Sequence, residues 1–206
     1  MPPDIGFAMP LRMPDRMLRE AIMYAERGWR VHPLRPGRKD PATLRGCLDA
    51  TTDRDRLTRY WTARPSANIG IATGPDSGLW VLDVDGPKGR ASLAELEAAF
   101  GSLPTTYAVR TGRDDGGSQM YWRFPVLPDG VRLANSQNRI GPHLDVRAAG
   151  GYVVAPPSIH PSGRPYAVEV AVDNVAIDVP LRVAVVQDGA PEKVITTKAI
   201  RTTVTM

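Results

Sequence analysis

Two aspartates, Asp83 and Asp85, alternate with a valine at the end of the apolar segment 79–82. Such a segment predicts a buried strand, in which side chains two residues apart project from the same face. Two ionised carboxylates placed so close repel each other unless a cation or a proton lies between them. Mg²⁺ takes oxygen ligands of this kind, often together with substrate phosphates. The pair therefore favours a metal site, and the alternative is a turn at Gly86 with Asp83 making a local capping contact.

A third carboxylate, Asp145, lies in another short apolar segment, Leu144-Asp145-Val146-Arg147. Three acids on strands can hold two metal ions, which would clamp the attacking and the leaving oxygens of a phosphoryl transfer. The alternative is an ion pair between Asp145 and Arg147 or another arginine.

Two polar loops are candidates for contacts with phosphate or nucleotide. Gly117 lets backbone amides approach a phosphate, and Ser118 and Gln119 add side-chain donors. Ser158 and His160 lie in a proline-rich loop after the apolar segment 152–155. A plain hairpin and a plain strand end are the commoner explanations of these two loops. The spacing of the histidines does not indicate zinc, and there is no Walker-type glycine loop.

Hydrophobic periodicity and breaker residues predict the elements that position these side chains. The first helix is expected from Asp15 to Gly28, the second over residues 53–62, and the third from the capping-box sequence at Ser92 to Gly101. Expected strands cover residues 29–34, 68–73, 79–84, 106–110, 119–124, 144–147, 152–155 and 166–170. Residues 68–73 and 79–84 are expected to pair. The predicted class is α+β, with a mixed or antiparallel sheet flanked by helices.

Composition narrows the possible classes of protein. The chain has 206 residues, of which 42% are hydrophobic, and it carries a formal net charge of +4. The single Cys47 excludes an intrachain disulfide and fits a reducing compartment. The apolar runs are too short to span a bilayer, and prolines and charges interrupt the first twenty residues. We expect a soluble cytoplasmic protein with no membrane partner. The positive charge weakly favours polyanionic partners. The chain has 22 arginines against four lysines, which suits phosphate recognition, but a GC-rich genome produces the same bias.

The order of short motifs resembles the bifunctional DNA primase/polymerase domain of phages, plasmids and integrated elements, within the archaeo-eukaryotic primase superfamily. The resemblance covers residues 18–166. The motifs that carry it are residues 25–29, 33–37 with Lys39 and Pro41, 50–53, Trp61, 65–74, 77–79, 81–85, 144–147 and 151–158. It implies an RNA-recognition-like catalytic sheet with an N-terminal α/β portion packed on it. It also implies that the enzyme joins nucleotides on a DNA template and releases pyrophosphate. We expect residues 1–14 to be a leader, 15–186 one catalytic domain, and 187–206 a flexible tail or linker.

The resemblance also assigns roles to individual residues. Asp83, Asp85 and Asp145 match the family's metal ligands, which implies two Mg²⁺ or Mn²⁺ ions and two-metal nucleotidyl transfer. Arg147 and Lys39 are candidates for stabilising the charge of the triphosphate. Expected partners are single-stranded DNA, nucleoside triphosphates and a helicase domain or protein.

One position departs from the family pattern. Gln119 stands where the family usually has a histidine that contacts the incoming triphosphate. Glutamine can donate hydrogen bonds to phosphate but cannot carry positive charge. We therefore expect weaker nucleotide binding or a lower rate.

Two other functions are compatible with parts of the sequence. The first is a catalytically weakened primase-like module that binds single-stranded DNA or nucleotide. The second, more remote, is a haloacid-dehalogenase-like phosphatase with Asp83 as its nucleophile, because the motif Asp83-Val84-Asp85-Gly86 ends a strand. That mechanism also needs a later lysine and an acidic pair, and no acidic pair follows a later strand.

Overall fold

The computed structural model describes residues 13–172, 182–185 and 193–196. The α-helices are α1 (Met13–Glu26), α2 (Arg54–Ala63) and α3 (Gly86–Phe100), with short 3₁₀ helices η1 (Gly46–Asp49) and η2 (Pro75–Ser77). The strands are β1 (Val31–Leu34), β2 (Asn68–Ala72), β3 (Leu79–Val84), β4 (Ala108–Arg110), β5 (Ser118–Arg123), β6 (Ser136–Gln137), β7 (Leu144–Arg147), β8 (Tyr152–Ala155), β9 (Ala167–Val170), β10 (Arg182–Val185) and β11 (Lys193–Thr196). The predicted α+β class is confirmed.

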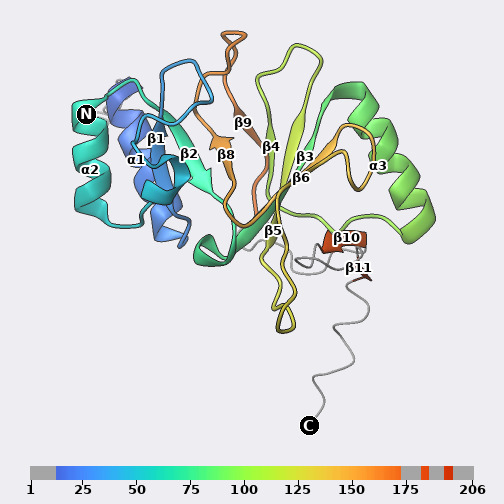
Figure 1. The fold of residues 1–206 in the computed structure, drawn as a ribbon. Coiled ribbons are helices and arrows are strands. Elements are labelled where there is room, and N and C mark those ends of the chain that lie inside the picture. Colours follow the sequence, from blue (N-terminus) through green and yellow to red (C-terminus); the bar gives the residue numbers. More distant parts are fainter. Residues whose placement is uncertain (1–12, 173–181, 186–192, 197–206) are drawn as a thin grey trace, which may run out of the picture.

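The strands up to β9 form two open antiparallel sheets. The smaller sheet has the order β1-β2-β8, and the larger has the order β6-β7-β3-β5-β4-β9. Figure 1 shows α1 and α2 beside the smaller sheet and α3 on the opposite flank of the molecule, against the larger one. Strands β10 and β11 pair with each other, β10 at the end of the expected catalytic domain and β11 within the expected flexible tail. The expected leader lies almost wholly outside the described residues, as does most of the expected tail.

Two hydrophobic cores follow from the alternation of side chains in β3. Val81 faces a core that joins α1, α2 and the smaller sheet to the larger sheet through residues such as Ile71 and Tyr121. Trp80 and Leu82 face a second core, under α3. Because one strand contributes to both cores, its two faces are equally apolar up to Asp83. The first carboxylate of the pair therefore interrupts the face that is shared between the two sheets.

The helix boundaries follow local signals only in part. Asp53 caps α2 by accepting a hydrogen bond from the Arg56 backbone N–H at 2.7 Å, as expected for an N-cap aspartate. The expected start of α3 at Ser92 is wrong, because the helix begins at Gly86 with Pro87 in its first turn. Ser92 lies in mid-helix and is buried. A capping-box spacing also arises by chance within a helix, and here the proline marks the true start.

The expected pairing of residues 68–73 with 79–84 is also wrong. β2 pairs with β1 and β8, whereas β3 pairs with β5 and β7. Only a single bridge, between Gly74 and Leu79, joins the two segments. The turn between them therefore carries the chain from one sheet to the other, rather than closing a hairpin.

The chain returns between the sheets at residues 148–151, and the two crossings touch. The Thr73 hydroxyl donates to the Ala148 carbonyl at 2.6 Å, and the Thr73 N–H donates to the Gly151 carbonyl at 2.9 Å. A Cβ on Gly74 would lie 3.0 Å from the Ala149 Cα, so the close approach requires glycine there. These contacts lie at the end of β8, next to the cavity described below.

Candidate active site

The three acids predicted as metal ligands lie on neighbouring strands. β3 runs between β7 and β5, and its Asp83 stands opposite Asp145 on one side and Gln119 on the other. Asp85 follows β3 directly and is the N-cap of α3. Antiparallel pairing thus brings residues from three separate sequence segments into one row across the sheet.

Asp83 and Asp85 interact electrostatically. The Asp83 side chain is only 18% exposed. Burial, together with the nearby charge of Asp85, raises the pKa of Asp83 to about 6. Asp85 makes no side-chain capping bond to α3. This pair has the features of a cation site, because it consists of two carboxylates of like charge and that of Asp83 is largely removed from water.

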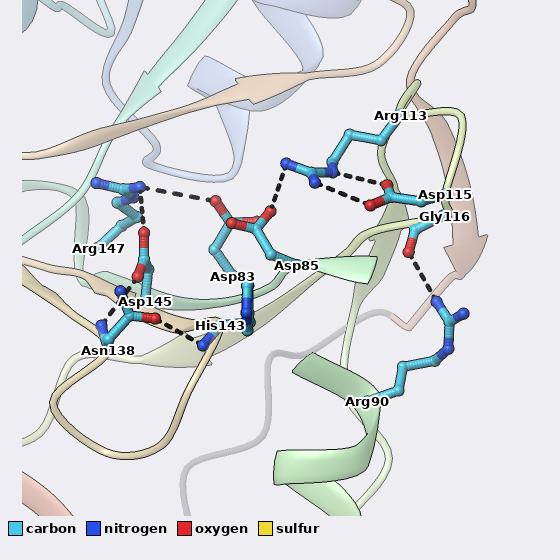
Figure 2. Close-up of polar contacts among 10 residues, drawn as sticks. All are labelled: Asp83, Asp85, Arg90, Arg113, Asp115, Gly116, Asn138, His143, Asp145 and Arg147. Atoms are coloured by element: carbon cyan, nitrogen blue, oxygen red, sulfur yellow. Dashed lines mark hydrogen bonds and ion pairs between the residues drawn. The ribbon is translucent and has the colours of Figure 1, made fainter. Parts of the chain in front are cut away.

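Two arginines contact the acids from opposite sides, as Figure 2 shows. The Arg147 guanidinium lies 2.8 Å from a carboxylate oxygen of Asp145 and 3.9 Å from one of Asp83. On the other side, Arg113 lies 3.1 Å from Asp85. The guanidinium of Arg113 is also held by two bonds to Asp115, at 2.9 and 3.0 Å, which raise the pKa of Arg113. Both arginines therefore neutralise acids that were predicted to bind metal.

Asp145 is more fully engaged than the other two acids. Besides Arg147, it accepts a hydrogen bond from the Asn138 backbone N–H at 3.1 Å, and the Asn138 side chain accepts from the His143 N–H at 2.6 Å. The ion pair considered as an alternative for Asp145 is therefore present. Among the described residues, no group of three or more histidine, cysteine, aspartate or glutamate side chains is arranged to hold a metal ion. The donor set that fits a cation in this arrangement is the pair Asp83 and Asp85.

A cavity of about 340 Å³ lies above this row of residues, between the two sheets. Asp83 contributes its acid to the lining, and Lys39, Gln119 and Arg147 contribute cationic and amide groups. The remaining lining residues are Asn135, Gly150, Gly151, Tyr152, Val153, Val154 and Tyr166. Three of the residues predicted to contact a nucleotide are thus brought together with one predicted metal ligand.

The other predicted nucleotide contacts lie elsewhere. Ser118 is on the opposite face of the sheet from Gln119, and its hydroxyl is 3.5 Å from Glu169. Ser158 is completely buried, and its hydroxyl accepts a hydrogen bond from the Ile69 N–H at 2.8 Å. A Cβ on Gly117 would lie 2.7 Å from the Thr111 hydroxyl, so this glycine permits close packing of the loop. Ser118 and Ser158 are therefore not part of the cavity lining.

His160 lies at the rim of the site. Its Nδ1 is 3.0 Å from the Ser162 hydroxyl, and its ring is tilted against Tyr166. Partial burial and then the nearby charges of Lys39 and Arg113 lower the pKa of His160. The Ser162 hydroxyl donates to the Gly112 carbonyl at 2.5 Å, so the loop carrying His160 contacts the loop carrying Arg113. Figure 1 shows these loops at the same edge of the molecule.

Sequence reasoning missed two residues that shape the site. Arg113 was visible only as part of a glycine-rich loop, and the signal was its position beside the acidic pair Asp114-Asp115. Asn68 is buried, and its side chain donates to the carbonyls of Arg38 and Ile159 and accepts from the Ile159 N–H. It therefore joins the loop of Lys39 to the loop of His160. Its place in the run Ala67-Asn68-Ile69, a polar residue starting an apolar strand, was the available signal.

The fold and the site define the class: an α+β protein whose antiparallel sheet places Asp83 in a cavity lined also by Lys39 and Arg147, with Asp85 directly after the same strand. The bifunctional DNA primase/polymerase, N-terminal family matches residues 21–181, and the chain belongs to this family. No curated protein matches the chain. Among the described residues, no helix has both the length and the apolar character needed to cross a membrane.

Proposed function

We propose that this protein transfers nucleotides to DNA under the direction of a template, as a primase, a DNA polymerase or both. The observation that carries the proposal is the pair Asp83 and Asp85 beside a cavity that also holds Lys39, Gln119 and Arg147. Acids next to cationic and amide donors are what a metal–triphosphate substrate needs. Family membership supports the same chemistry. The substrates are nucleoside triphosphates and single-stranded DNA.

Asp83 and Asp85 would hold the divalent ions, Mg²⁺ or Mn²⁺, with Asp145 joining them once Arg147 releases it. When bound, such ions would lower the pKa of the attacking hydroxyl and compensate the negative charge of the triphosphate. Lys39 binds phosphate oxygens through its compact ammonium charge, and Arg147 binds them through its planar guanidinium group. Gln119 donates an amide N–H from the strand next to Asp83. Tyr152 and Tyr166 form walls of the cavity and exclude water from the reacting groups.

The test is incorporation of labelled nucleotides on single-stranded DNA, with and without a primer, in Mg²⁺ and in Mn²⁺. We expect the Asp83→Asn/Asp85→Asn variant to lose incorporation by at least about a thousandfold, as removal of metal-holding groups should. The matched control is Asp55→Asn/Asp129→Asn, which removes two exposed carboxylates and should leave the rate unchanged. Equal rates in wild type and the Asp83/Asp85 variant would contradict the proposal.

A second candidate function is a module that binds single-stranded DNA or nucleotide with little or no turnover. Two observations favour it: Gln119 replaces a chargeable residue, and Arg147 and Arg113 occupy the acids. Binding of single-stranded DNA without incorporation in either metal would establish this second function. The first proposal also includes a role in phage or plasmid replication and a helicase partner. Copurification from a host that carries the phage or plasmid would test both.

A further inference from the structure

We call the 340 Å³ cavity beside Asp83 the acid-lined cavity. The loop that carries Lys39 into it also borders a second cavity, of about 580 Å³. Arg35, Pro36 and Pro41 of this loop line it, opposite residues of α2 and the chain that follows α2. The arginines of this lining are Arg35, Arg56 and Arg64, and we call the space the arginine cavity. Nothing in the chemistry described above uses it.

The net charge of the chain is concentrated in the sequence segment that forms the arginine cavity. Residues 35–64 contain eight of the 26 lysines and arginines but only four of the 22 aspartates and glutamates. The excess of four equals the formal net charge of the whole chain, so the remaining residues balance. A positive field confined to one surface attracts polyanions to that surface rather than to the molecule in general.

Only one carboxylate lines the arginine cavity, and arginines already pair with it. Asp49 lies 2.8 Å from Arg45 and 3.8 Å from Arg56, and a hydrogen bond from the Arg45 N–H lowers the pKa of Asp49. Arg35 lies 3.5 Å from Asp40, a carboxylate outside the lining, and Arg56 shares Asp49 with Arg45. The arginine cavity keeps a positive excess, and no carboxylate pair is present in its lining to hold a metal ion.

The same surface offers groups on which a base can pack. The ring of Tyr60 lines the arginine cavity, and the Arg56 guanidinium lies over it, 5.7 Å from its centroid. Leu44, also in the lining, is fully exposed, and the nearby Leu48 is 69% exposed. Surfaces that bind single-stranded nucleic acid combine a positive groove with rings and apolar groups against which bases stack.

We propose that the arginine cavity binds the phosphodiester backbone of single-stranded DNA, at a site outside the acid-lined cavity. The strand would pass over the Arg35–Pro41 turn, which contributes Lys39 to one cavity and Arg35 to the other. Arg35 and Arg64 contact phosphates, and Tyr60 with Leu44 contacts a base. This inference rests on the proposed function, because the strand is the template for the reaction at Asp83.

The test compares two double variants that remove the same charge. Arg35→Ala/Arg64→Ala strips the lining, whereas Arg54→Ala/Arg59→Ala removes two exposed arginines of α2 that do not line it. Binding of fluorescent oligodeoxythymidine is followed by anisotropy over a salt series, without metal or nucleotide. We expect roughly tenfold weaker binding for the first variant and a salt slope smaller by about 1.4, the value for two single-strand phosphate contacts. The second variant should bind like wild type.

Equal losses in the two variants would overturn the proposal, because binding would then follow net charge and not position. Displacement of the oligodeoxythymidine by inorganic phosphate or by deoxythymidine triphosphate, added to the same metal-free assay at constant ionic strength, would also overturn it, in favour of a free-phosphate site. The Asp83→Asn/Asp85→Asn variant separates the two proposals. If incorporation fails for every protein while DNA binding still depends on Arg35 and Arg64, the arginine cavity stands and the catalytic proposal falls.

Discussion

Arg113 occupies a position that a divalent cation would need. Its guanidinium is 3.1 Å from Asp85 and is anchored by two bonds to Asp115. The Asp115 carboxylate packs close to Gly86, where an added Cβ would lie 2.6 Å from it and where φ is +60°. Only a residue without a side chain permits this packing at the start of α3. The arginine is thus a built-in counterion for Asp85, and a cation has to compete with it.

We therefore expect Arg113→Ala to bind Mn²⁺ more tightly than wild type, by roughly three- to tenfold, since one charge-assisted contact to Asp85 is lost. Titration of the protein with Mn²⁺, followed by electron paramagnetic resonance, measures this without reference to activity. The matched control is Arg90→Ala, which removes an arginine that bonds to the Gly116 carbonyl at 2.7 Å but does not touch the acids. Weaker Mn²⁺ binding in Arg113→Ala would contradict competition.

Gln119 is the second position at which a single side chain decides the chemistry. It lies opposite Asp83 in the neighbouring strand and is nearly buried. We expect Gln119→His to raise nucleotide affinity and turnover several-fold, because a protonated imidazole adds positive charge beside the triphosphate. Ser118→His is the control, since that side chain lies on the other face of the sheet. Nucleotide affinity is measured by fluorescence titration and turnover by incorporation. Unchanged nucleotide affinity and turnover in Gln119→His would show that the glutamine does not lower either of them.

At the scale of elements, Asn68 is the residue that connects the two loops at the rim of the cavity, one carrying Lys39 and the other carrying His160. Its amide group bridges the Arg38 carbonyl, at 2.9 Å, to the Ile159 carbonyl, at 2.7 Å, from the first position of β2. Lys39 is next to one of these anchors and His160 is next to the other. The geometry of the cavity rim therefore depends on one buried amide of the smaller sheet.

We expect Asn68→Ala to lower the free energy of unfolding by roughly 1–3 kcal/mol, because buried carbonyl groups lose their donor. Asn68→Asp has the same shape but no donor, so it should destabilise as well, and it identifies the amide N–H groups as the cause. Urea unfolding measures both. An Asn68→Asp protein as stable as wild type would show that the bridge contributes little.

The accuracy of the sequence predictions depended on which interactions define each element. The bounds of β7 and β8 were predicted to the residue, because β7 alternates apolar and charged side chains after His143, and Gly151 and Pro156 flank the apolar run of β8. The pairing of β2 was not, because alternation identifies a strand without identifying its neighbour. In the site, the acids were recognisable from their types and spacing. The contact of Arg113 with Asp85 was not, since it depends on the path of a loop that no periodicity describes.

At the scale of the whole molecule, a histidine in the core links stability to pH. His32 is completely buried in β1, neither ring nitrogen has a hydrogen-bond partner among the described residues, and the ring packs edge-on against Tyr152. Burial lowers the pKa of His32 to about 4, although the charge of Asp49 opposes the shift. The folded protein thus keeps the ring neutral in a pH range where the unfolded chain protonates it, at its usual pKa near 6.5.

The consequence is a loss of stability on acidification. Above pH 6.5 the contribution of His32 is complete, and it falls between about pH 6.5 and pH 4 by roughly 2–4 kcal/mol. Asp83 acts in the opposite direction, because its raised pKa favours the folded state as it gains a proton. The experiment therefore compares wild type with His32→Phe by urea unfolding at several pH values. The stability advantage of wild type over His32→Phe should shrink or reverse as the pH falls.

The paired crossings at Thr73 and Ala148 determine how the enzyme can move. Two chain segments pass between the sheets at one place, bonded to each other, and a continuous core joins the sheets beyond them. Such a pair of bonded crossings resists rotation of one sheet against the other, so we expect the cavity beside Asp83 to keep its width between the sheets. Under the proposed function, nucleotide would then enter and leave by displacement of the loops that carry Lys39 and His160, while the sheets stay fixed.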